Sequence, residues 1–289
     1  MGVEQFSLSP YAQLENYPPL SSKEIERRWL GWRDGGKVKY GCWAKETIPV
    51  EQYGHLAQKF IDIISEQLRA TTYPSIADIG CGNGTGFIAG VSKVMERVPA
   101  LSVLLSDIQP DAVEETEKLY GHVFGEKITL VVLQADISDR ETAQRIITAN
   151  GETQVDALVC DSVLHFLTNE KLQNGLQTLQ AILKLGGIGY LSVCSIYNPA
   201  SVGSKADTNA LKIVHQITNG ATSENPVVFF QPEMGVLMTF FTQQSLRRIL
   251  MSNGLEIVEL EDGYNSRLRN GLGDKYPEHY CAIVRKGDK

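Results

Sequence analysis

The middle of the chain alternates between short apolar runs and longer amphipathic stretches. Short apolar runs predict buried strands, and apolar residues that recur at helical spacing between them predict helices. The predicted strands cover 75–79, 101–106, 127–133, 155–160 and 187–194, and the helices that follow the first four cover 85–97, 110–121, 139–149 and 169–184. Strands that alternate with helices in this way form a parallel sheet with helices on both faces.

The end of the chain departs from this alternation. A helix over 243–252 is followed by a strand over 255–260, a polar loop over 261–276 and a last strand over 279–285. Two strands joined by a loop without a crossover helix are most simply antiparallel. Ahead of the first strand, apolar residues at helical spacing predict a further helix near 51–70.

These elements divide the chain into an N-terminal arm with a helical cap, a ligand-binding core, an insertion, and a C-terminal helix with a strand pair. The expected bounds are 1–72, 73–194, 195–241 and 242–289. The insertion is expected to hold a helix at 206–218 and to cover the substrate side of the core. Its apolar side chains form part of that roof or, alternatively, fill the core: Phe229, Phe230, Met234, Leu237, Met238, Phe240 and Phe241.

Composition narrows the class of protein. Hydrophobic residues make up 43% of the 289 positions and charged residues 21%, an ordinary globular balance. The net charge of −7 argues against a broad nucleic-acid or anionic-membrane surface. With no basic-then-apolar leader and no long apolar run, we expect a cytoplasmic protein without a membrane span. The scattered cysteines indicate reduced thiols. Histidines and carboxylates do not occur at the spacing of metal ligands, so we expect no metal site.

The first strand runs directly into a turn built on alternating glycines. Asp78 is followed by Gly80, Gly82 and Gly84, and an apolar stretch then opens a helix. Glycine permits positive φ and close approach of a ligand to the backbone. The dinucleotide pattern G-x-G-x-x-G fails in both registers, and the phosphate-binding pattern fails because no Gly-Lys-Ser/Thr follows. A glycine-rich turn without a ligand is the alternative.

The Asp78-x-Gly80-x-Gly82-x-Gly84 pattern resembles the first motif of the class I S-adenosylmethionine (SAM)-dependent methyltransferases. The resemblance covers 75–194 well and 240–286 moderately. It implies an α/β, Rossmann-like sheet of seven strands, mostly parallel with the last strand antiparallel. It implies SAM as cofactor and S-adenosylhomocysteine as product, and a carboxylate beside the turn suits the positive charges of SAM.

The resemblance also implies cofactor contacts at the ends of the later strands. Asp107 would accept the ribose hydroxyls, Asp136 would receive the adenine amino group, and the backbone at 160–161 would meet the methionine part. The alternative for Asp107 is a helix cap or a solvated turn, and for Asp136 a helix cap. The expected cofactor residues in the core are Asp78, Gly80, Cys81, Gly82, Gly84, Asp107, Ile108, Asp136, Ile137, Cys160 and Asp161.

Two aromatic residues ahead of the first strand carry a further resemblance. Tyr40-Gly41-Cys42-Trp43 is similar to an aromatic element in the cyclopropane synthase and small-molecule N-methyltransferase branches. An aromatic ring face near a sulfonium is favourable, so Tyr40 and Trp43 are cofactor candidates. Burial of the helical cap is the alternative explanation for both rings.

Acid–base chemistry has one candidate near the fourth strand. His165 has the side chain best suited to take a proton near neutral pH, although the same position often serves as a structural turn in the family. Tyr197, His215 and Glu233 lie in the insertion and are candidates for substrate contact.

The sequence after the fourth strand bears on the substrate. Relatives that methylate amino groups of DNA and RNA carry (D/N/S)-P-P-(Y/F) there, whereas this chain has Asp161-Ser162-Val163-Leu164. No Pro-Cys of the pyrimidine C5 methylating relatives is present. We therefore expect methyl transfer to N or O of a small, partly apolar metabolite, by a monomer or homodimer without nucleic-acid or membrane partners. The alternatives are a protein or peptide methyltransferase and a SAM-binding protein without transfer activity.

Overall fold

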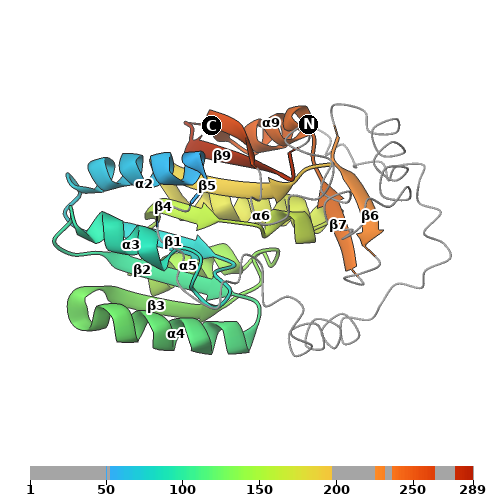
Figure 1. The fold of residues 1–289 in the computed structure, drawn as a ribbon. Coiled ribbons are helices and arrows are strands. Elements are labelled where there is room, and N and C mark those ends of the chain that lie inside the picture. The colour runs from blue at the N-terminus through green and yellow to red at the C-terminus, as the bar shows by residue number, and fades with distance from the viewer. Residues whose placement is uncertain (1–49, 51–52, 197–224, 232–235, 264–276, 289) are drawn as a thin grey trace.

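A seven-stranded sheet forms the centre of the molecule (Figure 1). The computed structural model describes residues 50, 53–196, 225–231, 236–263 and 277–288. The strand order is β3-β2-β1-β4-β5-β9-β8. Its strands are β1 (Ser75–Ile79), β2 (Ser102–Asp107), β3 (Thr129–Gln134), β4 (Val155–Cys160), β5 (Leu183–Cys194), β8 (Leu255–Gly263) and β9 (His279–Lys286).

The pairing of these strands confirms the predicted fold class. The first five strands pair in parallel, and β9 runs antiparallel to both β5 and β8. The strand order reverses between β1 and β4, and in open α/β sheets ligands bind beyond the carboxyl ends of the strands at such a switch point. The topology therefore directs attention to the ends of β1, β2 and β4.

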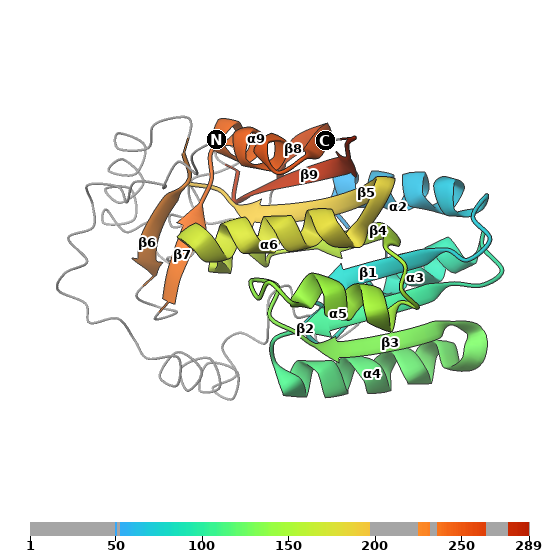
Figure 2. The ribbon, with the colours of Figure 1, turned by 180° about the vertical axis from the view of Figure 1, so that it is seen from behind.

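Helices cover both faces of the sheet (Figures 1 and 2). One face packs against α2, α3 and α4, and the opposite face against α5, α6 and α9. Their bounds are α2 (His55–Leu68), α3 (Ile88–Met95), α4 (Pro110–Phe124), α5 (Thr142–Ala149), α6 (Asn169–Ile182) and α9 (Gln243–Ser252). Two short 3-10 turns complete the core, η3 (Gly125–Lys127) and η4 (Leu164–Phe166).

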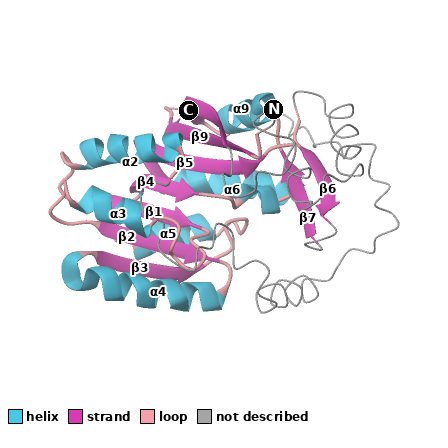
Figure 3. Cartoon of the chain, in the orientation of Figure 1, coloured by secondary structure: helices cyan, strands magenta, loops and turns pink. Residues whose placement is uncertain are grey.

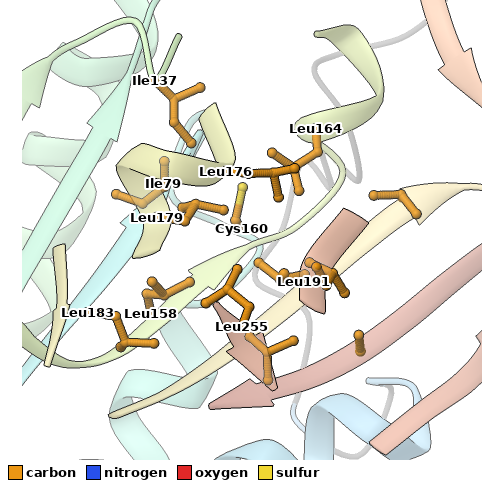
Figure 4. Close-up of a cluster of buried hydrophobic side chains, with 14 of the residues drawn as sticks. Ile79, Ile137, Leu158, Cys160, Leu164, Leu176, Leu179, Leu183, Leu191 and Leu255 are labelled. Atoms are coloured by element: carbon orange, nitrogen blue, oxygen red, sulfur yellow. The ribbon is translucent and has the colours of Figure 1, made fainter. Parts of the chain in front are cut away.

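The pleat of each strand distributes its side chains between the two faces. On β1, Ile76 packs under α2 and α3, whereas Ala77 and Ile79 join the cluster under α5, α6 and α9. Figure 4 shows this second cluster, with leucines of α6 against Ile79, Leu158 and Cys160. Successive strand residues point to opposite faces, so both faces are apolar along the middle of the strands.

Local sequence explains where some of the helices begin. Thr242 caps α9, because its hydroxyl accepts a hydrogen bond from the Ser245 backbone at 2.9 Å and the Ser245 hydroxyl bonds back to the Thr242 N–H. Pro110 stands at the start of α4, where its missing N–H costs nothing. The predicted helix over 243–252 and the predicted strands over 75–79 and 155–160 match the structure residue for residue.

The segment before α9 adds to what the sequence predicted. A separate hairpin of β6 (Val227–Gln231) and β7 (Val236–Phe240) lies beyond the end of β5, where no strand pair was expected (Figure 3). Phe241 belongs to the core, and Phe240 and Met238 are buried as well. Core filling, the alternative given for these residues, therefore describes these three side chains. The reason is that Phe241 pairs with the end of β5, donating its N–H to the Cys194 carbonyl at 3.0 Å.

The remaining predictions concern the ends of the chain. The helix expected near 51–70 is α2, and β8 extends three residues into the segment expected to be a loop. The helix expected at 206–218 and the N-terminal arm lie outside the described residues. In the part of the chain that the structure describes, four cysteines are free thiols, and three of them are buried. None of the described helices is both long and apolar enough to cross a bilayer.

Candidate functional site

The glycine turn after β1 is held against β2 by its own backbone. The N–H groups of Gly80 and Cys81 both donate to the Ser106 carbonyl, at 2.7 and 3.0 Å. Gly80, Gly82 and Gly84 have φ of 73°, 55° and 78°. A Cβ on Gly80 would lie 2.2 Å from the Cγ2 atom of Val163, so this position has both a steric and a conformational need for glycine.

Two side chains fasten the middle of the turn. The Thr116 hydroxyl of α4 donates to the Gly82 carbonyl at 2.7 Å, and the Gly82 N–H donates to the Asp107 carboxylate at 3.0 Å. The other oxygen of Asp107 accepts the Gln109 N–H at 2.9 Å. The alternative of a local turn role for Asp107 is therefore partly correct. Each carboxylate oxygen still has acceptor capacity, so a ribose contact is compatible with both bonds.

Three carboxylates gather at the carboxyl ends of β1, β2 and β4. Each lies two residues beyond a side chain that packs under the α2, α3 and α4 layer, namely Ile76, Leu105 and Val159. Because every second strand residue points to the same face, the three acids share that face. We call this group, made of Asp78, Asp107 and Asp161, the acidic edge.

Asp78 is the most enclosed member of the acidic edge. The residue is only 5% exposed, and within the described chain its carboxylate accepts no hydrogen bond. Burial, and then the charges of Asp161 and Asp107, raise the pKa of Asp78 to about 8. Burial also raises the pKa of Asp107. Like charges out of water favour the arrival of a cation, which would relieve their mutual repulsion.

Asp161 is positioned by the neighbouring strand β5. It accepts a hydrogen bond from the Ser192 hydroxyl, which itself accepts the Ser162 N–H at 2.9 Å. Ser162 has φ of 59°, an uncommon value for a residue with a side chain. Strain of this kind persists only where the surroundings impose it, and it is frequent next to ligand sites. Here the bend turns the chain away from β4 immediately after the carboxylate.

The residues expected to contact the cofactor on the adenine side differ in their exposure and in their contacts. Ile108 is 53% exposed, which leaves a large apolar side chain beside the glycine turn. One oxygen of Asp136 accepts the N–H and the hydroxyl of Ser138 at 2.8 and 2.7 Å, a local turn in the loop before α5, whose N-cap is Glu141. Ile137 packs in the core against α6, and its side chain is committed there (Figure 4). The Cys160 side chain is likewise buried, so a cofactor contact at 137 or 160 would use backbone atoms.

His165, the predicted general base, lies in the η4 turn and is 4% exposed. Burial and the neighbouring His279 lower the pKa of His165 to about 3. Its Nδ1 atom is buried without a hydrogen-bond partner in the described chain. The ring is therefore neutral and enclosed, an environment that opposes taking up a proton. A catalytic role for His165 stays a prediction.

Several predicted site residues lie outside the described residues. The aromatic pair Tyr40 and Trp43 falls there, as do Tyr197, His215 and Glu233 of the insertion. Sequence reasoning missed Ser192 and His279, which the fold brings to the acidic edge. The antiparallel order of the last two strands was the available signal, because it places the first residue of β9 at the carboxyl edge of the sheet.

The sequence and the fold both resemble known methyltransferases. Residues 77–188 match the sequence model of a family described as a methyltransferase domain. No curated protein matches the chain in sequence.

Two solved structures illustrate the likeness in fold. A SAM-dependent methyltransferase from Clostridium acetobutylicum is 13% identical, with 91% of this chain and 98% of that chain covered and a TM-score of 0.51. The 1,6-didemethyltoxoflavin-N1-methyltransferase of Burkholderia thailandensis, solved with 1,6-didemethyltoxoflavin and S-adenosylhomocysteine, is 16% identical, with 91% and 87% covered and a TM-score of 0.53. At these identities the likeness is one of fold.

Proposed function

We propose that the chain is a SAM-dependent methyltransferase that transfers a methyl group from SAM to a nitrogen or oxygen of a small, partly apolar metabolite. The match of residues 77–188 to the methyltransferase-domain model and the likeness of the sheet to that of a SAM-dependent methyltransferase support this proposal. The single observation that carries the proposal is the acidic edge at the switch point of the sheet. It places three carboxyl groups together, and the causes that raise the pKa of Asp78 include the charges of Asp161 and Asp107 and no cation.

The residues present fit SAM by charge and by polarity. SAM carries an ammonium and a sulfonium, and it lacks the phosphates that would call for basic side chains. Asp78, buried without a hydrogen-bond donor in the described chain, and Asp161 would face the positive part. Asp107 would hold the ribose hydroxyls, as the acid of a nucleotide site does. The exposed Ile108 would cover the adenine ring.

When bound, SAM supplies a methyl group already activated on a positively charged sulfur. The protein must then hold the acceptor in line with that group, exclude water and allow the acceptor to lose a proton. The rigid glycine turn contributes to orientation, because its backbone is bonded to β2, α4 and Asp107 at once. Catalysis in this scheme depends mainly on positioning.

A small acceptor is supported by charge and by analogy. The net charge of −7 and the acidic edge oppose a polyanionic substrate. The Burkholderia thailandensis enzyme of similar fold was solved with a small heterocycle, and its name states methylation at nitrogen. The division of the chain into core, 195–241 insertion and C-terminal part belongs to the same proposal, with the insertion on the acceptor side.

Calorimetry followed by a turnover assay tests the proposal. We expect heat of binding when SAM or S-adenosylhomocysteine is titrated into the folded full chain. We then expect release of S-adenosylhomocysteine with at least one member of a panel of heterocyclic amines, phenols and alcohols, and none with unstructured peptides. No binding of either nucleoside would overturn the proposal. Methylation of peptides alone would replace the small-molecule acceptor with a protein one.

A further inference from the structure

His279 is the first residue of β9 and is fixed in place by its backbone neighbours. It lies opposite Cys194 of β5 and Gly263 of β8. The Ser195 N–H donates to the Glu278 carbonyl at 2.9 Å, and the Glu278 N–H donates to the Gly263 carbonyl at 3.1 Å. A Cβ on Gly263 would lie 3.3 Å from the Cβ of His279, so the glycine leaves space beside the histidine. Two strands therefore fix the backbone at this residue.

The pleat places His279 on the face that carries the acidic edge. Along β9, Cys281 and Ile283 pack on the side of α2, whereas Tyr280 and Ala282 join the opposite cluster. His279 therefore shares the face of Cys281, which lies opposite Ser192. Two strand spacings, about 10 Å in total, separate β9 from β4. The sequence of groups across the sheet is thus Asp107, Asp78, Asp161, Ser192 and His279.

The surroundings of His279 keep its ring neutral. Burial lowers the pKa of His279, and the Asp161 carboxylate opposes that shift. Titratable groups on the packed elements include His165 on η4, Cys194 on β5, Cys281 on β9 and Glu278 just before it, and Glu261 and Asp262 on β8. Within the described residues, the His279 ring nitrogens have no hydrogen-bond partner. A partly buried neutral imidazole with a nearby carboxylate has the properties of a general base.

We propose that His279 is the residue that takes the proton from the methyl acceptor, at a place bordered on the cofactor side by Asp161. This inference rests on the proposed function. If Asp107 holds the ribose and Asp78 and Asp161 face the positive part of SAM, the cofactor spans β2 to β4. The acceptor then lies beyond β4, over β5 and β9, where His279 is the base that the described residues offer. The acceptor class is one with an N–H or O–H proton to lose.

The step balances without a further reactant. A lone pair on the acceptor nitrogen or oxygen forms the new bond to the methyl carbon, and the sulfur keeps the electron pair of the bond that breaks. The acceptor proton moves to a ring nitrogen of His279, and the Asp161 carboxylate stabilises the resulting imidazolium. His165 is less suited to this step, because its ring is enclosed and its pKa lies about 3.

Histidine titrations by NMR test the placement without turnover. The pKa of each imidazole is measured in the full chain with SAM and with S-adenosylhomocysteine, which differ by the sulfonium charge. His279→Gln assigns the resonance, and His122, exposed on α4, is the internal reference. We expect the His279 pKa to be lower with SAM by on the order of 0.5 unit, and the His122 pKa to be unchanged. Asp161→Asn in the unliganded chain should lower the His279 pKa further.

The kinetic test uses any acceptor that the panel identifies. We expect His279→Gln to lower kcat by about 100-fold or more, with the KM for SAM unchanged, and to remove the acidic limb of the pH profile. Added imidazole should restore part of the rate, and His122→Gln should behave as the parent. Equal His279 pKa values with SAM and S-adenosylhomocysteine, or an unchanged pH profile in His279→Gln, would overturn the inference. Failure of SAM to bind would instead reject the proposed function.

Discussion

The two faces of the same strands differ sharply where the strands end. Ile79 and Cys160 point into the cluster under α5, α6 and α9 and are nearly or completely buried among apolar side chains. Asp78 and Asp161, one residue away along the chain, point to the opposite face and form the acidic edge. A shift of one position along a strand thus separates a residue that stabilises the fold from a residue suited to bind a ligand.

The energetic consequences of the two faces are opposite. On the apolar face, burial removes hydrocarbon from water and stabilises the chain whether or not a ligand is present. On the acidic edge, burial and like charge destabilise the ionised carboxylates until a cation arrives. Substitutions on the two faces should therefore separate stability from cofactor affinity.

The largest expected effect is on the apolar face. Leu179→Ala removes a completely buried side chain of α6 and should lower the free energy of unfolding by about 2–5 kcal/mol, measured by urea denaturation. The Kd for SAM at low temperature should stay within about twofold of the parent, since α6 packs on the opposite face. Leu185→Ala, at a position 63% exposed, is the control and should change stability by less than about 0.5 kcal/mol. Equal losses in the two variants would contradict the packing described here.

The next substitution, at Asp78, should raise the free energy of unfolding. The pKa of Asp78 is raised to about 8 in the folded chain from an ordinary value of 3.8, so the folded state holds this proton more tightly than the unfolded state. The free energy of unfolding therefore falls as pH rises from about 4 to about 8. Asp78→Asn removes this dependence and should raise the free energy of unfolding at pH 8 by roughly 2–4 kcal/mol, while weakening SAM binding.

Thermal or urea unfolding across pH 4–9 measures the Asp78 effect. Asp62→Asn, at an exposed position on α2, should keep the pH dependence of the parent. A parent protein whose stability does not fall over this range, or an Asp78→Asn variant that binds SAM as well as the parent does, would contradict the account of the acidic edge.

Asp107→Ala should act mainly on binding. It removes the expected ribose acceptor and the bond to the Gly82 N–H, and we expect the affinity for SAM to fall by about 1–3 kcal/mol, or roughly 10- to 100-fold. Isothermal titration calorimetry measures the Kd, and Asp62→Ala is the matched control. An unchanged Kd in Asp107→Ala would refute the ribose assignment.

The smallest effect concerns the support of the glycine turn. Thr116→Val keeps the shape of a buried side chain and removes the 2.7 Å hydrogen bond to the Gly82 carbonyl. We expect a loss of about 1 kcal/mol in stability and a severalfold weaker Kd for SAM. Thr178→Val makes the same change in α6 on the opposite face and should leave the Kd unchanged. Equal affinities in the two variants would show that the turn keeps its shape without Thr116.

Local pattern was sufficient for much of the fold and for part of the site. The alternation of apolar runs and helical periods predicted each strand of the central sheet, because those elements depend on side chains close together in sequence. The glycine turn, Asp78 and Asp107 were likewise accessible, since they lie in one motif and at the end of the next strand. The burial of Phe241 stayed one of two alternatives, because it depends on pairing with the distant end of β5.

The sequence by itself determined the order of the elements and the residue that stands at each strand end, including three acids at three ends. The tertiary structure decided which of these ends are neighbours. It placed β9 between β5 and β8 and thereby brought His279 to the face of Asp161. Strand order is set by hydrogen bonds and packing between segments far apart in the chain, and the local pattern of hydrophobic and polar positions does not specify those partners.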